Sequence, residues 1–333
     1  MIMKKIEARI VADSMNKQGN RITTFILTYP RFIHAEVMTH RMFSRNAASS
    51  RAIPFDKMVN SIREEPFIPV VWQRDHKGMQ GTEYVFPPKE IEDLRANWEE
   101  AARYAAADAE ILHDMNITKQ ICNRILEPFM WYTALVTATE WDNFFELRLP
   151  KYVVKGKVYK TRKEAMDNLS YMPFKDWTDA QWMSHSKAAA EPHMQMLAEA
   201  MYDAMQVSTP NVLKAGEWHI PFGDKMDDEA ILEYTSHFKC FEMEPKIKRK
   251  IAVARCARLS YMTYDGDFSV EKDVELHDRL LKSRHLSPFE HVARCMTEDE
   301  YDNLVLYEKT KAQYGKCRNF TGFIQYRVLA ENE

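Results

Sequence analysis

The densest group of side chains that could bind an anion runs from His40 to Arg51. These twelve residues contain three arginines, three serines, a histidine and an asparagine, with no glycine, proline or acidic residue. Guanidinium groups among hydroxyls and an amide can give several hydrogen bonds to one anion, and phosphate is the commonest such partner. The spacing is equally typical of a solvated basic loop whose arginines form surface ion pairs. Both interpretations stay open on the residues alone.

Two further arginines, Arg124 and Arg148, lie in apolar surroundings of a helical region predicted for 118–149 and interrupted at Pro128. An arginine on an apolar face is destabilising unless it is paired. The residues therefore predict either internal ion pairs or ligand binding. The candidate partners for ion pairs are Glu127, Glu140 and Glu146.

A third polar group lies in the octet 284–291. Ser287, followed by a proline and then by Glu290, has the layout of a helix start with a capping box. His285 and His291 flank the glutamate, but they lack the i,i+4 spacing of helical zinc motifs, so we predict no metal site.

The elements that must position these groups begin with a hairpin. Residues 5–14 and 21–29 have the composition of two strands around a turn-rich centre. A short helix is predicted from Pro30, which would place the basic stretch at a helix-to-loop junction. The proline-rich segment 52–88 predicts a long ordered loop.

Helical periodicity dominates the rest of the chain. The residues at 151–163 are typical of basic strands, within a region at about 151–185 that we interpret as an insertion. The methionines of 188–205 are expected to fill the core and not to bind a cofactor. The predicted helices are 89–113, 188–205, 227–239, 246–261 and one around 274–281.

Composition limits the class of protein. The 333 residues are 45% apolar and suit one large unit or two coupled lobes. A net charge of −3 argues against a general nucleic-acid binder. The five cysteines are widely spaced, so neither a disulfide framework nor a zinc site follows. No segment has the length of a membrane span or the pattern of a signal peptide, and we expect a cytoplasmic protein without membrane contact.

Taken together, the motifs resemble those of the flavin-dependent thymidylate synthases. The signature of that family is Arg-His-Arg, seven residues, serine, and another arginine two residues later. The chain has Thr39-His40-Arg41, seven residues, Ser49 and then Arg51, with Asn46 at the asparagine of the family.

Two more segments are similar to motifs of the family. The heptapeptide His285-Leu286-Ser287-Pro288-Phe289-Glu290-His291 matches its Ser/Thr-Pro-Phe-Glu-His signature, and Cys256-Ala257-Arg258-Leu259-Ser260 matches its small-residue helix. Both follow the arginine-rich signature by more than 200 residues, whereas they precede it in the family. The resemblance therefore implies a circular permutation, which a compact domain with nearby termini tolerates.

The resemblance implies an α/β (α+β) fold, an antiparallel sheet with packed long helices. It implies one catalytic domain over 1–333, assembled as a homotetramer with sites at subunit interfaces. Three positions depart from the family. Thr39 replaces its first signature arginine, Glu36 a glutamine and Ala47 a glutamate.

The activity implied by the resemblance is FAD-dependent C5 methylation of a pyrimidine deoxynucleotide, dUMP to dTMP, with methylenetetrahydrofolate and NADPH as co-substrates. Such chemistry needs no cysteine nucleophile. The departures at Glu36, Thr39 and Ala47 keep open a flavin enzyme that acts on dCMP or another pyrimidine nucleotide, or that transfers a hydroxymethyl group. A homologue that binds nucleotide without catalysis is the alternative from a different class.

The resemblance also assigns residues. Ser49 and Arg148 would act in catalysis, Ser49 by orienting the nucleotide and Arg148 by polarising the base. The flavin would be bound by His40, Arg41, Asn46, Asn143, Ser260, His285, Ser287 and Glu290. The nucleotide would be bound by Ser49, Arg51, Arg124 and Arg148, and by Gln325 and Arg327, which resemble the lost glutamine and arginine.

Overall fold

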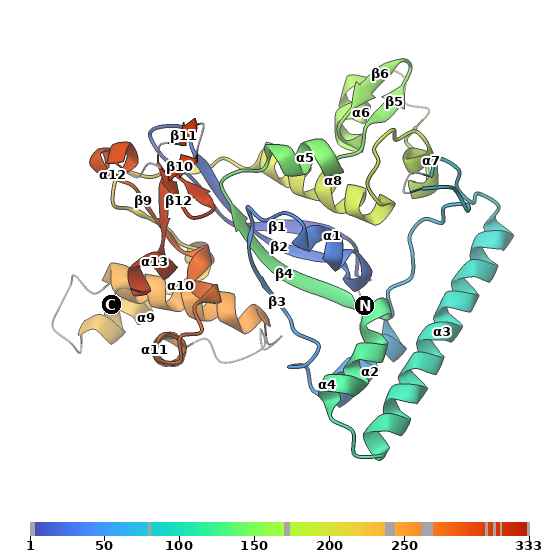
Figure 1. Cartoon of the computed structure of the whole chain (residues 1–333), viewed down its shortest axis with the longest axis horizontal. Helices are drawn as coiled ribbons and strands as arrows, with labels where there is room; N and C mark the ends of the chain where they lie inside the picture. The colour runs from blue at the N-terminus through green and yellow to red at the C-terminus, as the bar shows by residue number, and fades with distance from the viewer. Residues whose placement is uncertain are drawn as a thin grey trace.

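A sheet of mostly antiparallel strands lies at the centre of the molecule (Figure 1). The computed structural model describes residues 4–78, 81–169, 174–236, 244–260, 269–303, 306–308, 311–313 and 315–331. In that part of the chain, the strands of this sheet lie in the order β3-β4-β2-β1-β7, and β7 joins in parallel to β1. They are β1 (Glu7–Met15), β2 (Arg21–Pro30), β3 (Ser44–Ala47), β4 (Trp131–Ala138) and β7 (Asn211–Val212). The hairpin and the mixed α/β class are confirmed.

Strand β4 corrects the helix predicted through this region. The segment 118–149 forms α4 (Lys119–Leu126), the 3₁₀ turn η2 (Glu127–Phe129), β4, and α5 (Asp142–Arg148). Helix α8 (Pro192–Val207) packs on one face of the sheet and α10 (Glu244–Ser260) packs on the other. A strand buried on both faces is apolar throughout and lacks alternation, so its sequence cannot be told from that of a buried helix.

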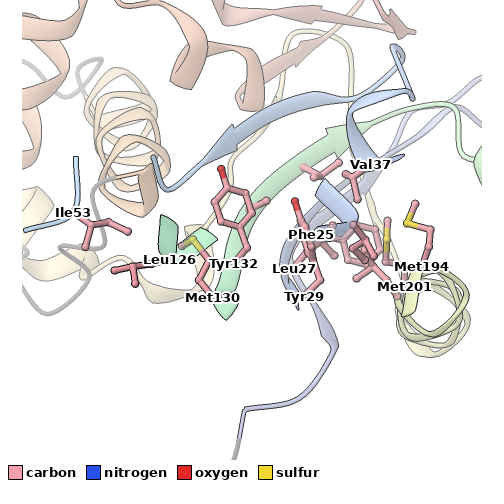
Figure 2. Packing of buried hydrophobic residues seen from close by; sticks show 14 of the residues in the cluster. Phe25, Leu27, Tyr29, Val37, Ile53, Leu126, Met130, Tyr132, Met194 and Met201 are labelled. Carbon is pink, nitrogen blue, oxygen red and sulfur yellow. The ribbon is translucent and has the colours of Figure 1, made fainter. Parts of the chain in front are cut away.

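The methionines of α8 fill hydrophobic cores, as predicted: Met194 and Met201 belong to the main core, and Met196 belongs to the cluster around Tyr152. Figure 2 shows Met194 and Met201 of α8 beside Phe25 and Leu27 of β2. On the opposite face, Leu135 of β4 lies with α10 residues in a second cluster. The sheet is therefore held between two helices that are distant in the sequence.

The segment 52–88 is not one long loop. Helix α2 (Phe55–Glu64) follows Pro54 and buries Phe55, Met58, Val59 and Ile62, which recur at helical spacing. Helix α3 (Pro88–Asp114) confirms the prediction for 89–113, begins with proline in its first turn and runs along one side of the molecule (Figure 1). The sequence did not predict α2, because the prolines before and after it are typical of loops.

The basic stretch forms an edge strand and not only a loop. After η1 (Arg31–Ile33) and the short helix α1 (His34–Met38), β3 pairs with β4 so that Ser44 lies opposite Thr137 and Ala47 opposite Ala134. The helix before the stretch is confirmed, and the loop predicted after it is wrong for 44–47. Because it is a strand, neighbouring residues of the stretch face opposite sides.

The C-terminal part brings the second motif onto this edge strand. Helix α11 (Val270–Lys282) confirms the helix around 274–281, and η5 (Ser287–His291) packs against β3 and α10. No side-chain cap bond forms at the start of η5, so the capping box predicted at Ser287 is wrong. The strand that follows the turn, β9 (Ala293–Cys295), is the centre of a small sheet in the order β14-β9-β8, with β14 (Phe323–Gln325) and β8 (Trp218–His219) on its two sides.

Residues 151–185, predicted as an insertion, form most of another hydrophobic cluster, to which Val71 and Tyr84 also belong. Tyr152, Phe174 and Trp182 belong to it. Arg162 ties the region to α8 through Glu199, with a 3.2 Å contact. The elements here are β5 (Tyr152–Val154), β6 (Lys157–Tyr159), α6 (Arg162–Asn168) and α7 (Asp179–Ser184). The strands predicted at 151–163 are confirmed.

The remaining elements are small apart from α9, which confirms the helix predicted from 227. They are η3 (Gly223–Lys225), α9 (Asp228–Ser236), α12 (Glu298–Asn303), β10 (Leu306–Glu308), β11 (Lys311–Gln313), β12 (Lys316–Cys317), β13 (Phe320–Thr321) and α13 (Tyr326–Ala330). The last residues of the helices predicted at 227–239 and 246–261 lie outside the described part. Within that part, every helix is too short or too polar to cross a membrane.

Candidate functional site

The basic stretch and the 285–291 turn meet at a cavity of about 500 Å³, here named the outer cavity. Its lining residues are Arg45, Asn46, Ala47, Ser49, Arg51, Ala52, Gln120, His285 and Ser287. Five of the residues assigned from the sequence, Asn46, Ser49, Arg51, His285 and Ser287, therefore lie around one space, although about 235 residues separate the two groups in the chain.

The outer cavity is lined by polar groups, one of which has a hydrogen-bond donor without a partner in the described part of the chain. Asn46 is 5% exposed, and its side-chain Nδ2 is buried with no hydrogen-bond partner in the described part of the chain. Leaving such a donor unpaired costs about 1–3 kcal/mol, and Asn46 is one of the residues that line the cavity. Arg51 adds an exposed cation and Ser49 a half-buried hydroxyl. The arrangement can bind an anion through charge-assisted hydrogen bonds.

A row of buried, hydrogen-bonded side chains connects the 285–291 turn to the strands of the central sheet. We name Ser14, His219, Thr24, Thr137 and His291 the buried polar chain. His219 contacts Ser14 Oγ through Nδ1 at 2.9 Å and Thr24 Oγ1 through Nε2 at 2.8 Å. Thr137 Oγ1 lies 2.8 Å from Thr24 Oγ1 and 2.8 Å from His291 Nδ1. Burial lowers the pKa of both His219 and His291 to about 3, so both imidazoles are neutral.

A second cavity of about 340 Å³, here named the inner cavity, adjoins the first. Its lining is Tyr29, His34, Val37, Met38, Phe43, Arg45, Ala47, Ala134, Val136, Ser287 and Glu290. Arg45, Ala47 and Ser287 line both cavities. The predicted residues Ser287 and Glu290 thus border a mostly apolar space that continues the polar one.

Sequence reasoning missed Arg45, Tyr29 and His34 as site residues. Arg45 is half-buried and donates through Nη1 to the carbonyl oxygen of Met38 at 2.8 Å, which fixes its guanidinium between the cavities. The alternation of β3 puts Arg45 on the same face as Ala47, and that signal could have identified it once β3 was recognised as a strand. Tyr29 and His34 come from β2 and α1, and no local pattern links them.

Arg148 and His40 form a separate cluster next to the cavities. Arg148 Nε donates to His40 Nε2 at 3.0 Å, and Nη2 donates to Thr39 Oγ1 at 3.3 Å. Burial, then the nearby guanidinium groups of Arg148 and Arg45, lower the pKa of His40 to about 4. His40 is therefore a neutral acceptor. Both residues lie outside the linings of the two cavities.

The two C-terminal residues are engaged by the protein itself. Arg327 forms an ion pair with Glu290 and also donates through Nε to Glu331 at 2.9 Å. Gln325 is 1% exposed, and its Nε2 donates to Ser44 Oγ at 3.1 Å and to an asparagine of the neighbouring turn. These contacts fasten the C-terminal segment to the start of β3.

The other assigned residues lie outside both linings. Arg124 is half-exposed and pairs at 3.5 Å with Glu127, one of the ion-pair partners expected for it. Glu140 and Glu146 instead pair with Lys316 and Lys151. Arg41 and Asn143 are exposed. Ser260 ends α10, and its side chain lies outside the described residues.

Comparison with known proteins gives solved structures but no sequence relatives. No family model matches the sequence, and no curated protein matches it. The chain is similar to the UMP/dUMP methylase PolB from Streptomyces cacaoi bound with 5-Br UMP, with 15% identity, 61% of this chain and 89% of that chain covered, and a TM-score of 0.41. For PolB bound with 5-Br dUMP, the identity is 13%, the coverages are 61% and 91%, and the TM-score is 0.42. At this level of similarity the solved structures do not assign a function to this chain. The residues that line its two cavities have to indicate it.

Proposed function

We propose that the protein is an enzyme that methylates C5 of a pyrimidine deoxynucleotide, dUMP to dTMP, with bound FAD and with methylenetetrahydrofolate and NADPH as co-substrates. The observation that carries the proposal is the outer cavity, where Asn46, Ser49 and Arg51 meet His285 and Ser287. These are the residues through which the two sequence motifs resemble flavin-dependent thymidylate synthases.

In this proposal, Arg51 and Ser49 hold the phosphate of the nucleotide. A guanidinium gives paired, charge-assisted hydrogen bonds to phosphate oxygens, and a nearby hydroxyl fixes their direction. Asn46 Nδ2, which is buried and unpartnered within the described residues, would donate to a ligand oxygen. Ser49 orients the nucleotide and does not act as a covalent nucleophile, because no partner base is hydrogen-bonded to it in the described part of the chain.

The residues present fit a flavin. Ser287 and Glu290 border the mostly apolar inner cavity, which suits a planar ring. A flavin bound here would supply transfer of the one-carbon unit and of hydride, so the protein needs no nucleophilic cysteine. Neutral His40 holds the guanidinium of Arg148 in place, and Arg148 would polarise the base.

Assembly into a homotetramer is part of the proposal. Arg124, Arg41 and Asn143 lie on the surface outside both cavities, where a second copy could bring them to a site shared between subunits. A circular permutation relative to the family is likewise proposed. The two motifs lie around one cavity, although their order along the chain is the reverse of their order in the family.

Ala47 favours one alternative substrate. Ala47 borders both cavities, at the position where the family keeps a glutamate. Without this carboxylate, the cavity wall has one hydrogen-bond acceptor fewer with which to recognise a ligand. The second candidate is therefore an enzyme that acts on dCMP or another pyrimidine nucleotide, or that delivers a hydroxymethyl group. A homologue that binds nucleotide without catalysis remains the candidate from a different class.

The test is product analysis by mass spectrometry. The purified protein, loaded with FAD, is incubated with dUMP or dCMP in turn, together with methylenetetrahydrofolate and NADPH. We expect dUMP to gain one methyl group. A methyl or hydroxymethyl group on dCMP would select the second candidate, and a protein that takes up no FAD and forms no product would refute both enzymes.

A further inference from the structure

The segment 49–53, which carries two residues proposed to hold phosphate, is a hydrogen-bonded turn. Ala52 N donates to the carbonyl oxygen of Ser49 at 2.9 Å, so Ser50 and Arg51 are the two central residues of the turn. Arg51 is exposed, lines the outer cavity and has no side-chain partner in the described part of the chain. Because surface turns are mobile unless other elements hold them, the direction of Arg51 depends on what holds its neighbours.

Helix α4 holds this turn with a stripe of three side chains. Lys119, Asn123 and Glu127 follow one another at intervals of four residues, which places them on one face of the helix and of the 3₁₀ turn after it. Lys119 Nζ donates to the carbonyl oxygen of Ala52 at 3.1 Å, and Glu127 Oε1 accepts from Ser50 Oγ at 2.5 Å. The stripe therefore contacts the turn on both sides of its central arginine.

Asn123 is the middle residue of the stripe and is 0% exposed. Its Nδ2 donates to the carbonyl oxygens of Ser50 at 2.7 Å and Ile53 at 3.1 Å. Both amide protons are thus used on the turn, and an oxygen in the place of Nδ2 would face two carbonyl oxygens. This fixes the orientation of the amide, although its Oδ1 is buried without a described partner. Ile53 and Leu126 of α4 both belong to the main core (Figure 2), which anchors the end of the turn.

The far end of the stripe is attached to the central sheet. Glu127 Oε2 pairs with Arg31 Nη2 at 3.3 Å. The guanidinium of Arg31 lies over the ring of Tyr132 in β4, 5.0 Å from its centroid. The turn is therefore connected through the stripe to a helix and to a strand, which are more rigid than a loop.

We propose that Lys119, Asn123 and Glu127 are positioning residues, which hold this turn so that Arg51 meets the phosphate of the nucleotide. The inference rests on the proposed function and adds to it three residues that line neither cavity. A cation that is already held in its binding direction loses less conformational freedom on binding than a mobile one. The stripe therefore raises the affinity for phosphate without contacting it.

The experiment measures the phosphate part of nucleotide binding. Calorimetry gives the affinities of the full chain and of its variants for dUMP, deoxyuridine and inorganic phosphate. Asn123→Asp keeps the shape of the side chain but replaces the Nδ2 donor by an oxygen. Lys119→Met removes the donor at nearly constant length, and Lys119→Arg restores a donor.

Asn16→Asp is the matched control. Asn16 is also a buried asparagine, 2% exposed, and its Nδ2 donates to the side chain of Asn20 and to the carbonyl oxygen of Gly322. It lines neither cavity. Thermal unfolding shows that each variant is folded, and the Lys119 variants decide the question if Asn123→Asp does not fold.

We expect Asn123→Asp to weaken dUMP binding about tenfold and to leave deoxyuridine binding unchanged, because the turn loses two hydrogen bonds and Arg51 loses its direction. Lys119→Met should weaken dUMP binding about threefold, and Lys119→Arg should restore it. Asn16→Asp should change neither affinity, whatever its melting temperature. An unchanged ratio of the dUMP and deoxyuridine affinities in folded Asn123→Asp and Lys119→Met would overturn the inference.

A double variant separates positioning from a general loosening of the fold. Because Asn123 acts through Arg51, adding Asn123→Asp to Arg51→Gln should weaken dUMP binding by less than about twofold. Two losses that simply multiply would show that Asn123 does not act through Arg51, and would refute its positioning role.

The two proposals fail separately. Binding of inorganic phosphate that depends on Asn123, without any methylated product, would refute the proposed function and keep the positioning role. Methylated product with dUMP affinity independent of Asn123 and Lys119 would keep the function and refute the positioning role. A protein that binds neither dUMP nor inorganic phosphate would refute both.

Discussion

The buried polar chain and the outer cavity are two polar groups built on different strands of the same sheet, and they differ in how far their hydrogen-bonding groups are paired. In the buried polar chain each side chain contacts another member, and burial keeps both histidines neutral. Around the outer cavity, Asn46 Nδ2 has no described partner, and Arg51 is an exposed cation. One atom of the buried polar chain, His291 Nε2, is also buried without a described partner, but His291 lines neither cavity. We therefore propose that the buried polar chain stabilises the fold and that the polar groups around the outer cavity bind a ligand.

His291 links the two regions. Its Nδ1 closes the buried polar chain on Thr137, and Ser287 of the same turn lines the outer cavity. The chain therefore acts on function indirectly, by holding the 285–291 turn at the edge strand. Changes in the two regions should separate cleanly into losses of stability and losses of affinity.

The largest expected effect is on the buried polar chain. His219→Leu leaves Ser14 and Thr24 without their shared partner in a site that is 0% exposed, so the free energy of unfolding should fall by about 3 kcal/mol. Chemical denaturation measures it. The control His76→Leu changes an exposed residue and should shift stability by less than about 0.5 kcal/mol. A fall equally small for His219→Leu would show that the chain does not stabilise the fold.

The next effect is on affinity at the outer cavity. Arg51→Gln removes a charge-assisted contact to phosphate, so dUMP should bind at least about tenfold more weakly with no change in melting temperature. Arg63→Gln is the matched control, because Arg63 is an exposed arginine that pairs with Glu110 and lies outside the linings of both cavities. Equal affinities for the two variants would contradict the assignment of Arg51.

A third effect, counted for each pH unit, separates the two regions by pH. His219 and His291 have folded-state pKa values of about 3, below the ordinary value of 6.5. The unfolded chain thus binds more protons between these values, and the stabilisation, complete above pH 6.5, is lost as the pH falls toward 3. Each histidine should contribute about 1.4 kcal/mol per pH unit in this window. Denaturation curves of His219→Gln should show a slope smaller by one histidine, and an unchanged slope would refute the neutral form.

The smallest effect is expected at Arg124. Its pair with Glu127 is half-exposed, so Arg124→Gln should change the free energy of unfolding by less than about 1 kcal/mol. A loss well above this value would mean that the ion pair is structural. A drop in nucleotide affinity at unchanged stability would show instead that Arg124 reaches a ligand.

The sequence predicted the parts of the fold whose pattern is local. The hairpin of β1 and β2 and the helix α3 follow from composition and from apolar periodicity. Strand β4 was mistaken for helix because both of its faces are buried, one in the main core and the other beside α10, and that burial depends on segments distant in the sequence. Helix α2 was missed because prolines before and after it are typical of loops.

The site was predicted in part. Resemblance to a family brought Asn46, Ser49 and Arg51 together with the 285–291 turn, and the structure has these residues around one cavity. The resemblance could not predict that buried Gln325 contacts Ser44 at the start of β3 or that Arg327 pairs with Glu290. Both contacts depend on how the C-terminal segment packs against the rest of the chain.

The most direct test of the account compares dUMP with deoxyuridine, which lacks the phosphate. If the unpartnered donors of the outer cavity bind phosphate, the protein should bind dUMP at least about tenfold more tightly than deoxyuridine, and Arg51→Gln should remove most of that difference. Equal affinities for the two ligands in the unmodified protein would contradict the account.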